Sequence, residues 1–224
     1  MEQNQNLFWL RWSGYLGTIT ILSIVVFDVI LVTVPLPVES FNIQNVSELL
    51  SPWRIIVGFY GTLLFPFTLI GLLHIYLALN HSSRWYSLPP VIIGAVAYLW
   101  GAVFHGSLAY QLAIHQSGDI SHELSTTLDA LFLPLRVSFT VLIFISSIWL
   151  FVSLWKGEHL YPKWMKWASP IVIILILRIL TYFTSPLIVG ILVPAGSNLG
   201  MAGYLAISTW WFSKRVDEMT HTSH

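Results

Sequence analysis

The sequence predicts an all-α polytopic membrane protein, a six-transmembrane-helix bundle with both termini in the cytoplasm. The chain of 224 residues is 56% hydrophobic and only 9% charged, and its mean hydropathy is +0.75. Soluble domains do not reach this composition because they need charged residues on their surfaces. Apolar runs of the roughly 20 residues that a spanning helix requires also recur along the whole chain.

The apolar runs predict one transmembrane domain over residues 1–224. Its spans are expected at about 13–34, 55–79, 89–115, 126–154, 167–192 and 196–213. The first run has no small-residue cleavage site, so we expect a retained helix, not a signal peptide. The chain contains no Cys, which excludes disulfides, thiolate metal sites and Cys nucleophiles. Its formal net charge of zero gives no basic surface for nucleic acid.

The charged residues outside the spans predict the orientation in the cell membrane. One set of loops and tails is basic and contains Arg11, Arg84, Lys156, Lys163, Lys166, Lys214 and Arg215. The opposite loops contain Arg54 with Glu39, Glu48, Asp119 and Glu123. All Trp except Trp53 and Trp100 lie at the basic ends of the spans, as in an interfacial belt. The positive-inside rule therefore places both termini in the cytoplasm.

Several segments predict local departures from straight helices. Pro66 and Pro134 each remove a backbone donor within a span and should kink it. Residues 184–186 interrupt the fifth span, and we expect partly unwound backbone at residues 194–198, where the sixth begins. In the long loop between the first two spans, residues 46–50 form either a short helix that acts as a lid or part of a solvated loop.

Few ionisable residues lie deep within the spans. They are Asp28, His74, His105, Asp129, Arg136 and Arg178. An Arg at the centre of a membrane helix costs about 2.5–3.5 kcal/mol on insertion scales, so it needs a partner, a water-filled cavity or a function that compensates this cost. By helical rise, all of them except His74 lie at the middle or in the outer half of the bilayer. The two candidate acids, Asp28 and Asp129, could therefore neutralise the two arginines.

The helical spacing of polar residues predicts that these side chains face one another. Asp129, Arg136 and Thr140 form a stripe on the fourth span, and His105 continues a stripe of small and polar residues on the third. A bundle interior is where such faces belong. We interpret Asp28, His105 and Asp129 as candidate catalytic acids and bases, and Arg136 and Arg178 as ligand-binding residues that hold an anionic or carbonyl oxygen. The structural alternative is a buried ion-pair network that fixes helix register.

The sequence predicts no metal site and no cofactor. His105 and His115 are separated by roughly 15 Å along a helix, whereas one ion holds its ligands at about 2 Å. The predicted partner is a membrane lipid or another amphipathic small molecule, and the oligomeric state is left open.

Four strings of sequence resemble an uncharacterised family of bacterial six-helix membrane proteins. They are residues 14–17 leading to Asp28, residues 51–58, residues 71–79 and residues 104–109. The resemblance covers about half of the chain and implies the fold, a bacterial membrane location and a set of characteristic polar positions, but no activity. Through it Arg54 and His74 join Asp28 and His105 as candidate site residues, and we assign both to ligand binding.

The stretch that contains His105, residues 104–111, is also similar to an element of alkaline ceramidases, in which the His binds zinc. This resemblance implies a metal-dependent membrane hydrolase, although the last span of this chain has no His to complete such a site. The leading hypothesis is a polar pocket that binds a lipid-like molecule, a quinone or an isoprenoid, and whether the pocket also transforms this molecule is left open. The alternatives are the ceramidase-type hydrolase, a proton-coupled carrier or sensor, and a structural or partner-binding protein.

Overall fold

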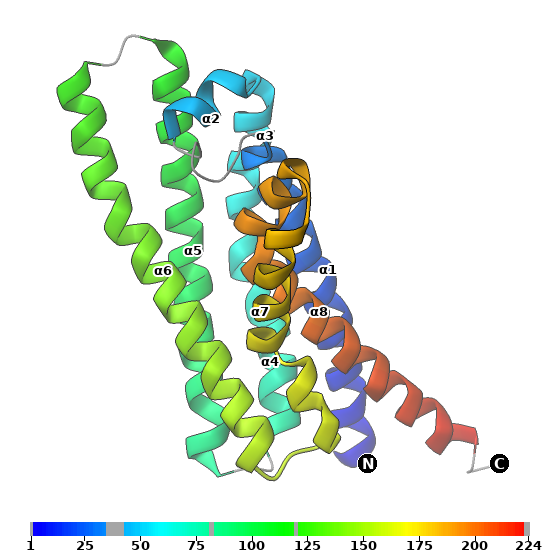
Figure 1. Ribbon diagram of the computed structural model, residues 1–224. Coiled ribbons are helices and arrows are strands. Elements are labelled where there is room, and N and C mark those ends of the chain that lie inside the picture. Colours follow the sequence, from blue (N-terminus) through cyan, green and yellow to red (C-terminus); the bar gives the residue numbers. More distant parts are fainter. Residues whose placement is uncertain (1, 35–42, 81–82, 119–120, 222–224) are drawn as a thin grey trace.

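The computed structural model describes residues 2–34, 43–80, 83–118 and 121–221, which form α- and 3₁₀-helices and no strands. The helices are α1 (Glu2–Val32), α2 (Ile43–Leu49), α3 (Pro52–Gly61), η2 (Thr62–Phe67), α4 (Thr68–Leu79), α5 (Arg84–Ser117), α6 (His122–Lys156), η3 (Lys163–Ala168), α7 (Pro170–Leu180), η4 (Thr181–Phe183) and α8 (Pro186–His221). The short helix α2 crosses one end of the bundle, and both termini lie at the other (Figure 1). We call these the α2 end and the termini end.

Among the described residues, five helical segments are long and apolar enough to cross a membrane, not the six predicted. They are Phe8–Val32, Pro52–Leu79, Arg84–Ser117, Glu123–Lys156 and Leu187–Arg215. The predicted interruption at residues 184–186 is confirmed, and residues 167–192 do not form a spanning helix. Thr184 is extended there, with φ −119° and ψ 166°, and the ring of Pro186 disfavours a helical conformation at the preceding residue. The helical segment before this break, Pro170–Phe183, is too short to count as a span.

The prediction of unwound backbone at residues 194–198 is also wrong, because α8 continues through them. Pro194 has no N–H to donate to the carbonyl of Gly190, four residues earlier. The hydroxyl of Thr33, the residue that follows α1, donates to that carbonyl at 3.4 Å. A neighbouring side chain thus compensates the missing bond, which is how membrane helices tolerate proline.

The same compensation joins α5 to α6. Pro89 and Pro90 leave the carbonyls of Trp85 and Tyr86 without their helical donors. Trp149 Nε1 donates to the first at 3.1 Å, and the Ser153 hydroxyl donates to the second at 2.7 Å. Of the two predicted kinks, Pro66 lies in the 3₁₀ segment η2, whereas Pro134 lies within the continuous helix α6.

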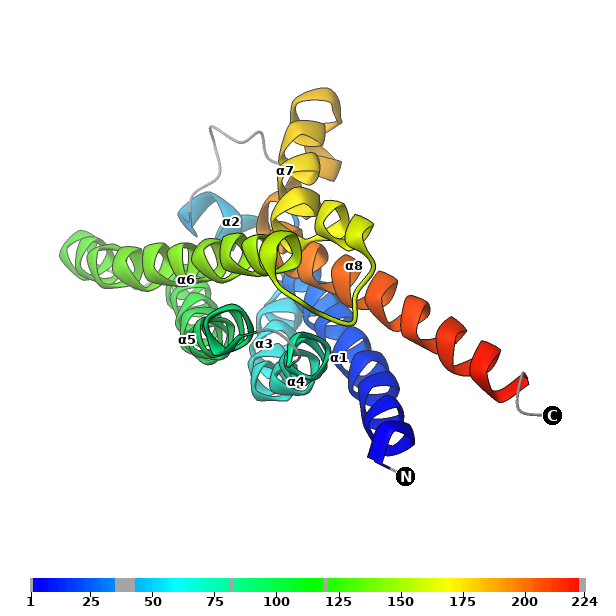
Figure 2. The same ribbon diagram turned by 90° about the horizontal axis from the view of Figure 1, so that it is seen from below.

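The helices α1 and α4 approach each other closely. A Cβ added at Gly17 of α1 would meet the backbone of Gly71 in α4, whose nitrogen would lie 2.8 Å away. A buried cluster from α1, α4, α5, α6 and α8 forms the main core, and a smaller cluster lies under α2. Toward the α2 end, α6 leans away from α7 and α8 (Figures 1 and 2). The contact between α1 and α4 is therefore tight, whereas the bundle widens toward the α2 end on the side of α6.

Candidate functional site

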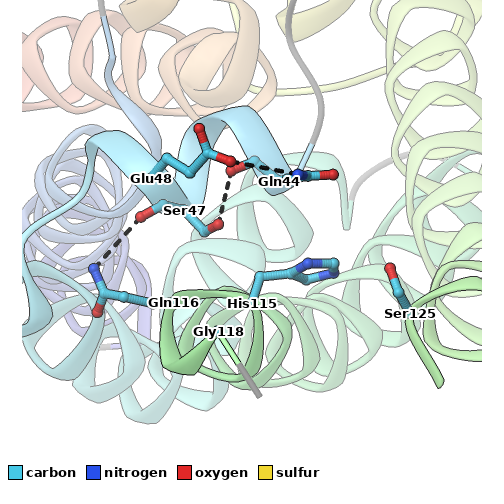
Figure 3. A pocket seen from close by; sticks show the side chains of 7 residues that line it. All are labelled: Gln44, Ser47, Glu48, His115, Gln116, Gly118 and Ser125. Atoms are coloured by element: carbon cyan, nitrogen blue, oxygen red, sulfur yellow. Dashed lines mark hydrogen bonds between the residues drawn. The ribbon is translucent and has the colours of Figure 1, made fainter. Parts of the chain in front are cut away.

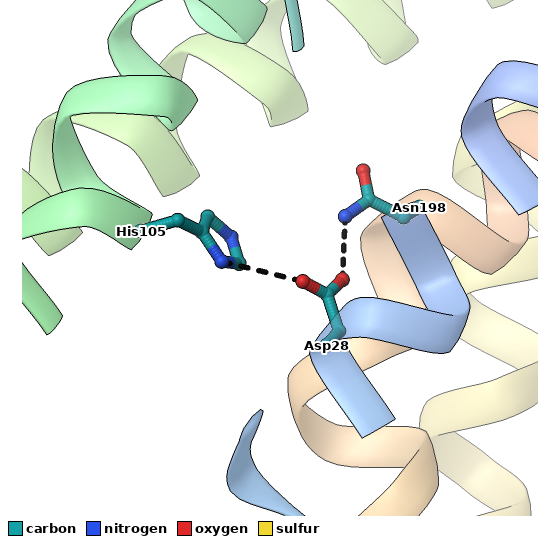
Figure 4. A network of polar contacts seen from close by, with 3 residues as sticks. All are labelled: Asp28, His105 and Asn198. Carbon is teal, nitrogen blue, oxygen red and sulfur yellow. Dashed lines mark hydrogen bonds and ion pairs between the residues drawn. The ribbon is translucent and has the colours of Figure 1, made fainter. Parts of the chain in front are cut away.

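A buried carboxylate lies where α1, α5 and α8 approach one another. Asp28 of α1 is only 2% exposed. Its Oδ1 lies 3.3 Å from Nδ1 of His105 on α5, and its Oδ2 accepts a hydrogen bond of 2.7 Å from Nδ2 of Asn198 on α8 (Figure 4). Both oxygens of the carboxylate thus have a polar partner from a different helix. This arrangement fixes the orientation of Asp28 and of the imidazole beside it.

The contact with Asp28 favours one tautomer of His105. With Nδ1 3.3 Å from Oδ1, a proton on Nδ1 would face the carboxylate, and Nε2 of that neutral ring would be an acceptor. Aromatic rings surround the imidazole, with centroids at 4.8 Å for Phe65, 5.0 Å for Phe104 and 6.2 Å for Phe139. A base oriented by a carboxylate in an apolar setting is an arrangement suited to moving a proton.

A cavity of about 270 Å³ adjoins this pair. Asp28, His105, Arg136, Thr140 and Arg178 supply polar groups to its wall, together with Ser197. The rest of the wall is mainly apolar and comprises Leu31, Val32, Ile43, Val46, Phe104, Leu108, Leu112, Phe132, Phe139, Val193 and Pro194. Four of the predicted site residues therefore line one cavity.

Neither arginine of the cavity has a carboxylate partner among the residues that the structure describes. Arg178 reaches the Val193 carbonyl, with Nη2 3.5 Å from the oxygen, and no ion pair is formed there by Arg136. Both side chains are exposed. Since His105 and Asn198 occupy the oxygens of Asp28, that acid does not neutralise Arg178 as the sequence analysis considered.

Three predicted site residues lie away from the cavity wall. Asp129 is exposed on α6, one to two turns nearer the α2 end than Arg136. Arg54 of α3 donates to the carbonyls of Ile30 and Thr33, both at 2.7 Å. These carbonyls belong to the last turn of α1, whose final carbonyls have no helical donor. Arg54 is thus a C-terminal cap of α1.

The third of these residues, His74, lies in a separate cluster toward the termini end. It is fully buried; its Nδ1 is 2.7 Å from the Leu10 carbonyl, and its Nε2 contacts the Ser208 hydroxyl. Because a carbonyl only accepts, Nδ1 carries the proton and Nε2 accepts from Ser208. Both ring nitrogens are therefore occupied by the protein itself, and His74 joins α1, α4 and α8.

Asn198 was not among the predicted site residues. It lies within the segment that was expected to be unwound, where side-chain directions cannot be assigned. As part of a helix, it falls on one face with Leu205, Ser208 and Phe212, and all four are buried. A helical interpretation of residues 194–198 would have placed an amide opposite Asp28.

A second pocket lies on the other side of α2 and is open and polar. It measures about 620 Å³ and is lined by Gln44, Ser47, Glu48, His115, Gln116, Gly118 and Ser125 (Figure 3). Gln116 of α5 donates to the carbonyls of Ser47 and Leu50, which holds α2 in place. Since Ile43 and Val46 of α2 line the inner cavity, this helix separates the two pockets. Of the two alternatives for residues 46–50, the short helix is confirmed for residues 46–49, which belong to α2, whereas Leu50 lies just beyond its end.

Among the described residues, no group of three or more His, Asp or Glu side chains is placed to hold a metal ion. The pair formed by Asp28 and His105 offers two such ligands, fewer than a structural or catalytic zinc site requires. The ionisable groups that line the cavity are two guanidinium groups, one carboxylate and one imidazole.

The fold and the composition define a polytopic α-helical membrane protein. The chain belongs to the Family of unknown function (DUF6796), which it matches over residues 10–215. The expected membership of an uncharacterised family is thereby confirmed, whereas the bacterial origin and the ceramidase likeness stay predictions. No curated protein and no solved structure matches the chain.

Proposed function

We propose that this protein binds an amphipathic molecule, such as a lipid, a quinone or an isoprenoid, in the cavity between α1, α5, α6, α7 and α8. The observation that carries the proposal is the pair of arginines, Arg136 and Arg178, on a largely apolar cavity wall without an acidic partner among the described residues. Ionisable side chains inside membrane segments are rare and mark binding or transport pathways. A ligand with a polar end and an apolar body matches both parts of this wall.

Within this proposal, His105 is the candidate base and Asp28 is the residue that orients it. A reaction of the bound molecule would begin with proton transfer to His105 Nε2, assisted by an arginine that stabilises negative charge on a substrate oxygen. Asp129 is not on the cavity wall, so we propose no step for it. The carrier or sensor, the metal-dependent hydrolase and the structural protein stay as alternatives.

We also propose that the protein lies in the cell membrane with the α2 end outside. The starts of α1 and α5 and the ends of α6 and α8 lie together at the termini end (Figure 1). Arg11, Arg84, Lys156, Lys214 and Arg215 belong to these segments. The positive-inside rule places that end in the cytoplasm. The cavity would then lie in the outer half of the bilayer.

Native mass spectrometry of the protein purified in a neutral detergent tests the proposal. We expect the wild type to retain an amphipathic molecule, and Asp28→Asn, His105→Ala and Arg178→Gln each to lose it while the circular dichroism spectrum stays helical. If folded variants retain the same molecules in the same amounts as the wild type, or if the wild type binds no member of a panel of lipids, quinones and isoprenoids, the proposal is wrong.

A further inference from the structure

The charge on the cavity wall is unbalanced. Arg136 and Arg178 each carry a permanent positive charge. The acid on the wall, Asp28, has one oxygen next to His105 and the other bonded to Asn198. A carboxylate held in this way cannot turn toward either guanidinium without losing both partners. A ligand that neutralises the two arginines would therefore have to bring its own negative charge.

We infer that the ligand is an amphiphile with an oxyanion headgroup, a phosphate or a carboxylate, and one apolar chain. The inference rests on the proposed function and narrows it, because neutral quinones and alcohols are then excluded as preferred ligands. A guanidinium presents its N–H donors in a planar fork that matches two oxygens of a phosphate or carboxylate. Arginines on two different helices, α6 and α7, would contact such a headgroup from two sides.

The apolar part of the wall is suited to a single chain. The ring of Phe104 stacks on Phe132 at 5.1 Å and on Phe139 at 5.5 Å between centroids. The three rings form a continuous aromatic surface on α5 and α6. The volume of about 270 Å³ is slightly below the ~300–1,000 Å³ of ordinary ligand pockets. Such a cavity holds a headgroup and the beginning of one chain, and the remainder of the chain must leave it.

The exit for the chain lies between α6 and α7. Arg136 and Arg178 line the cavity from these two helices and are themselves exposed. The cavity therefore reaches the lateral surface of the bundle where α6 leans away from α7 (Figures 1 and 2). Bilayer lipid covers this surface in a membrane, so an amphiphile would enter sideways with its chain still among the lipids.

The experiment compares ligands that share one chain and differ in the headgroup. Oleate carries a carboxylate, oleoyl lysophosphatidate carries a phosphate and oleyl alcohol is neutral. Binding of each is measured by native mass spectrometry and by the thermal shift of the protein in nanodiscs of phosphatidylcholine, which has no net charge. We expect at least one of the anionic amphiphiles to bind about tenfold or more tightly than oleyl alcohol, and the stronger of the two to identify the headgroup.

Arginine variants test the origin of that preference. Arg136→Gln and Arg178→Gln should each weaken binding of the anionic ligand about tenfold and leave oleyl alcohol unchanged. Arg178→Lys, which keeps the charge, should retain more of the binding than Arg178→Gln. Arg84→Gln is the matched control, because it removes one exposed positive charge at the termini end of α5. It should not change binding of any ligand.

The outcomes separate this inference from the proposed function. If oleyl alcohol binds as tightly as both anions, or if Arg84→Gln weakens binding as much as Arg178→Gln, the headgroup inference is wrong and amphiphile binding still stands. If none of the oleoyl compounds and no lipid, quinone or isoprenoid binds, both are wrong. The comparison among ligands uses the wild-type protein, so it does not depend on whether any variant folds.

Discussion

Among the residues whose burial the structure describes, His74 and His105 are the buried histidines, and their surroundings differ. His74 has both ring nitrogens bonded to the protein, one to a backbone carbonyl and one to Ser208. His105 has one nitrogen next to Asp28 and lines a cavity that also contains two arginines. A buried histidine with no hydrogen-bonding capacity left is a structural element. One that keeps an acceptor beside a cavity has the means to contact a ligand.

The packing around His74 also differs from the packing around His105. At the termini end, a Cβ on Gly14 would lie 2.8 Å from His74 Nδ1, so the helices leave no space. At the α2 end, the helices enclose a cavity of about 270 Å³. The difference indicates that the termini end maintains the fold, whereas the α2 end is available for binding.

The largest effect is expected where α1 crosses α4. At Gly17 a Cβ would collide with backbone atoms of Gly71, which cannot move independently of the helix. Gly17→Ala should therefore lower the free energy of unfolding by about 4 kcal/mol or prevent folding. Denaturation of the purified protein by sodium dodecyl sulfate in mixed micelles measures this change.

Gly106→Ala is the matched control for that substitution. Gly106 lies beside His105 on α5, and the nearest atom to its added Cβ would be Thr62 Cγ2 at 3.9 Å. This is ordinary contact, and alanine favours the helix by about 0.5–1 kcal/mol over glycine. Equal losses of stability in the two variants would contradict the proposed difference in packing between the two ends.

The two histidines should separate stability from binding. His74→Ala removes two hydrogen bonds and leaves a cavity in a tight core, so we expect a loss of about 3 kcal/mol. His105→Ala removes a side chain that already borders a cavity, so we expect a loss of about 1 kcal/mol on the same scale, together with loss of the bound amphiphile. Unfolding and native mass spectrometry of both variants provide the measurements. A folded His74→Ala protein that loses its ligand would show that the ends are not independent.

Asn198 should contribute through Asp28. Asn198→Leu removes the donor to Asp28 Oδ2, and a buried acceptor left without a donor costs about 1–3 kcal/mol. In a protein that already carries Asp28→Asn, the same substitution should cost less, because the charged acceptor is gone. A double-mutant cycle of unfolding free energies measures this coupling. Additive effects would indicate that the two side chains do not depend on each other.

The sequence predicts the class of fold and most of the polar residues on the cavity wall. The helical spacing of the polar residues and their depth in the bilayer place His105, Arg136 and Thr140 together, and all three line the cavity. Both quantities follow from the geometry of a single helix, so the sequence is sufficient to predict them. Asp129 was placed on the same stripe as Arg136, but it lies near the start of α6 and does not line the cavity. Toward that end α6 leans away from α7 and α8 (Figure 1). The direction of a whole helix depends on its neighbours, which periodicity does not describe.

The remaining differences involve interactions between distant segments. Arg54 caps backbone carbonyls at the end of α1. Every residue has a backbone carbonyl, so the sequence does not show which of them a distant side chain will bond. Pro194 was taken as the start of a helix because its lost hydrogen bond is visible in the sequence. The replacement donor, Thr33, is not. Because residues 194–198 were predicted to be unwound, Asn198 was not assigned to a helix face and was not predicted as a site residue.

An effect confined to high pH is expected from Tyr161, which packs beside His74 at 6.4 Å between ring centroids. Tyr161 lies in the connection between α6 and η3 and is buried, and burial raises its pKa from 10.0 to about 12. The folded state therefore keeps its proton at a pH where the unfolded chain has lost it. The free energy of unfolding should be highest below pH 10 and decline as the pH rises toward 12, by about 1.4 kcal/mol at pH 11.

The variant Tyr161→Phe cannot ionise at this position. Its free energy of unfolding should therefore decline less over this interval than that of the wild type when both are unfolded in the same mixed micelles. Parallel declines would indicate that Tyr161 is accessible to water, and the termini end would then be less tightly closed than its contacts with His74 and Phe212 imply.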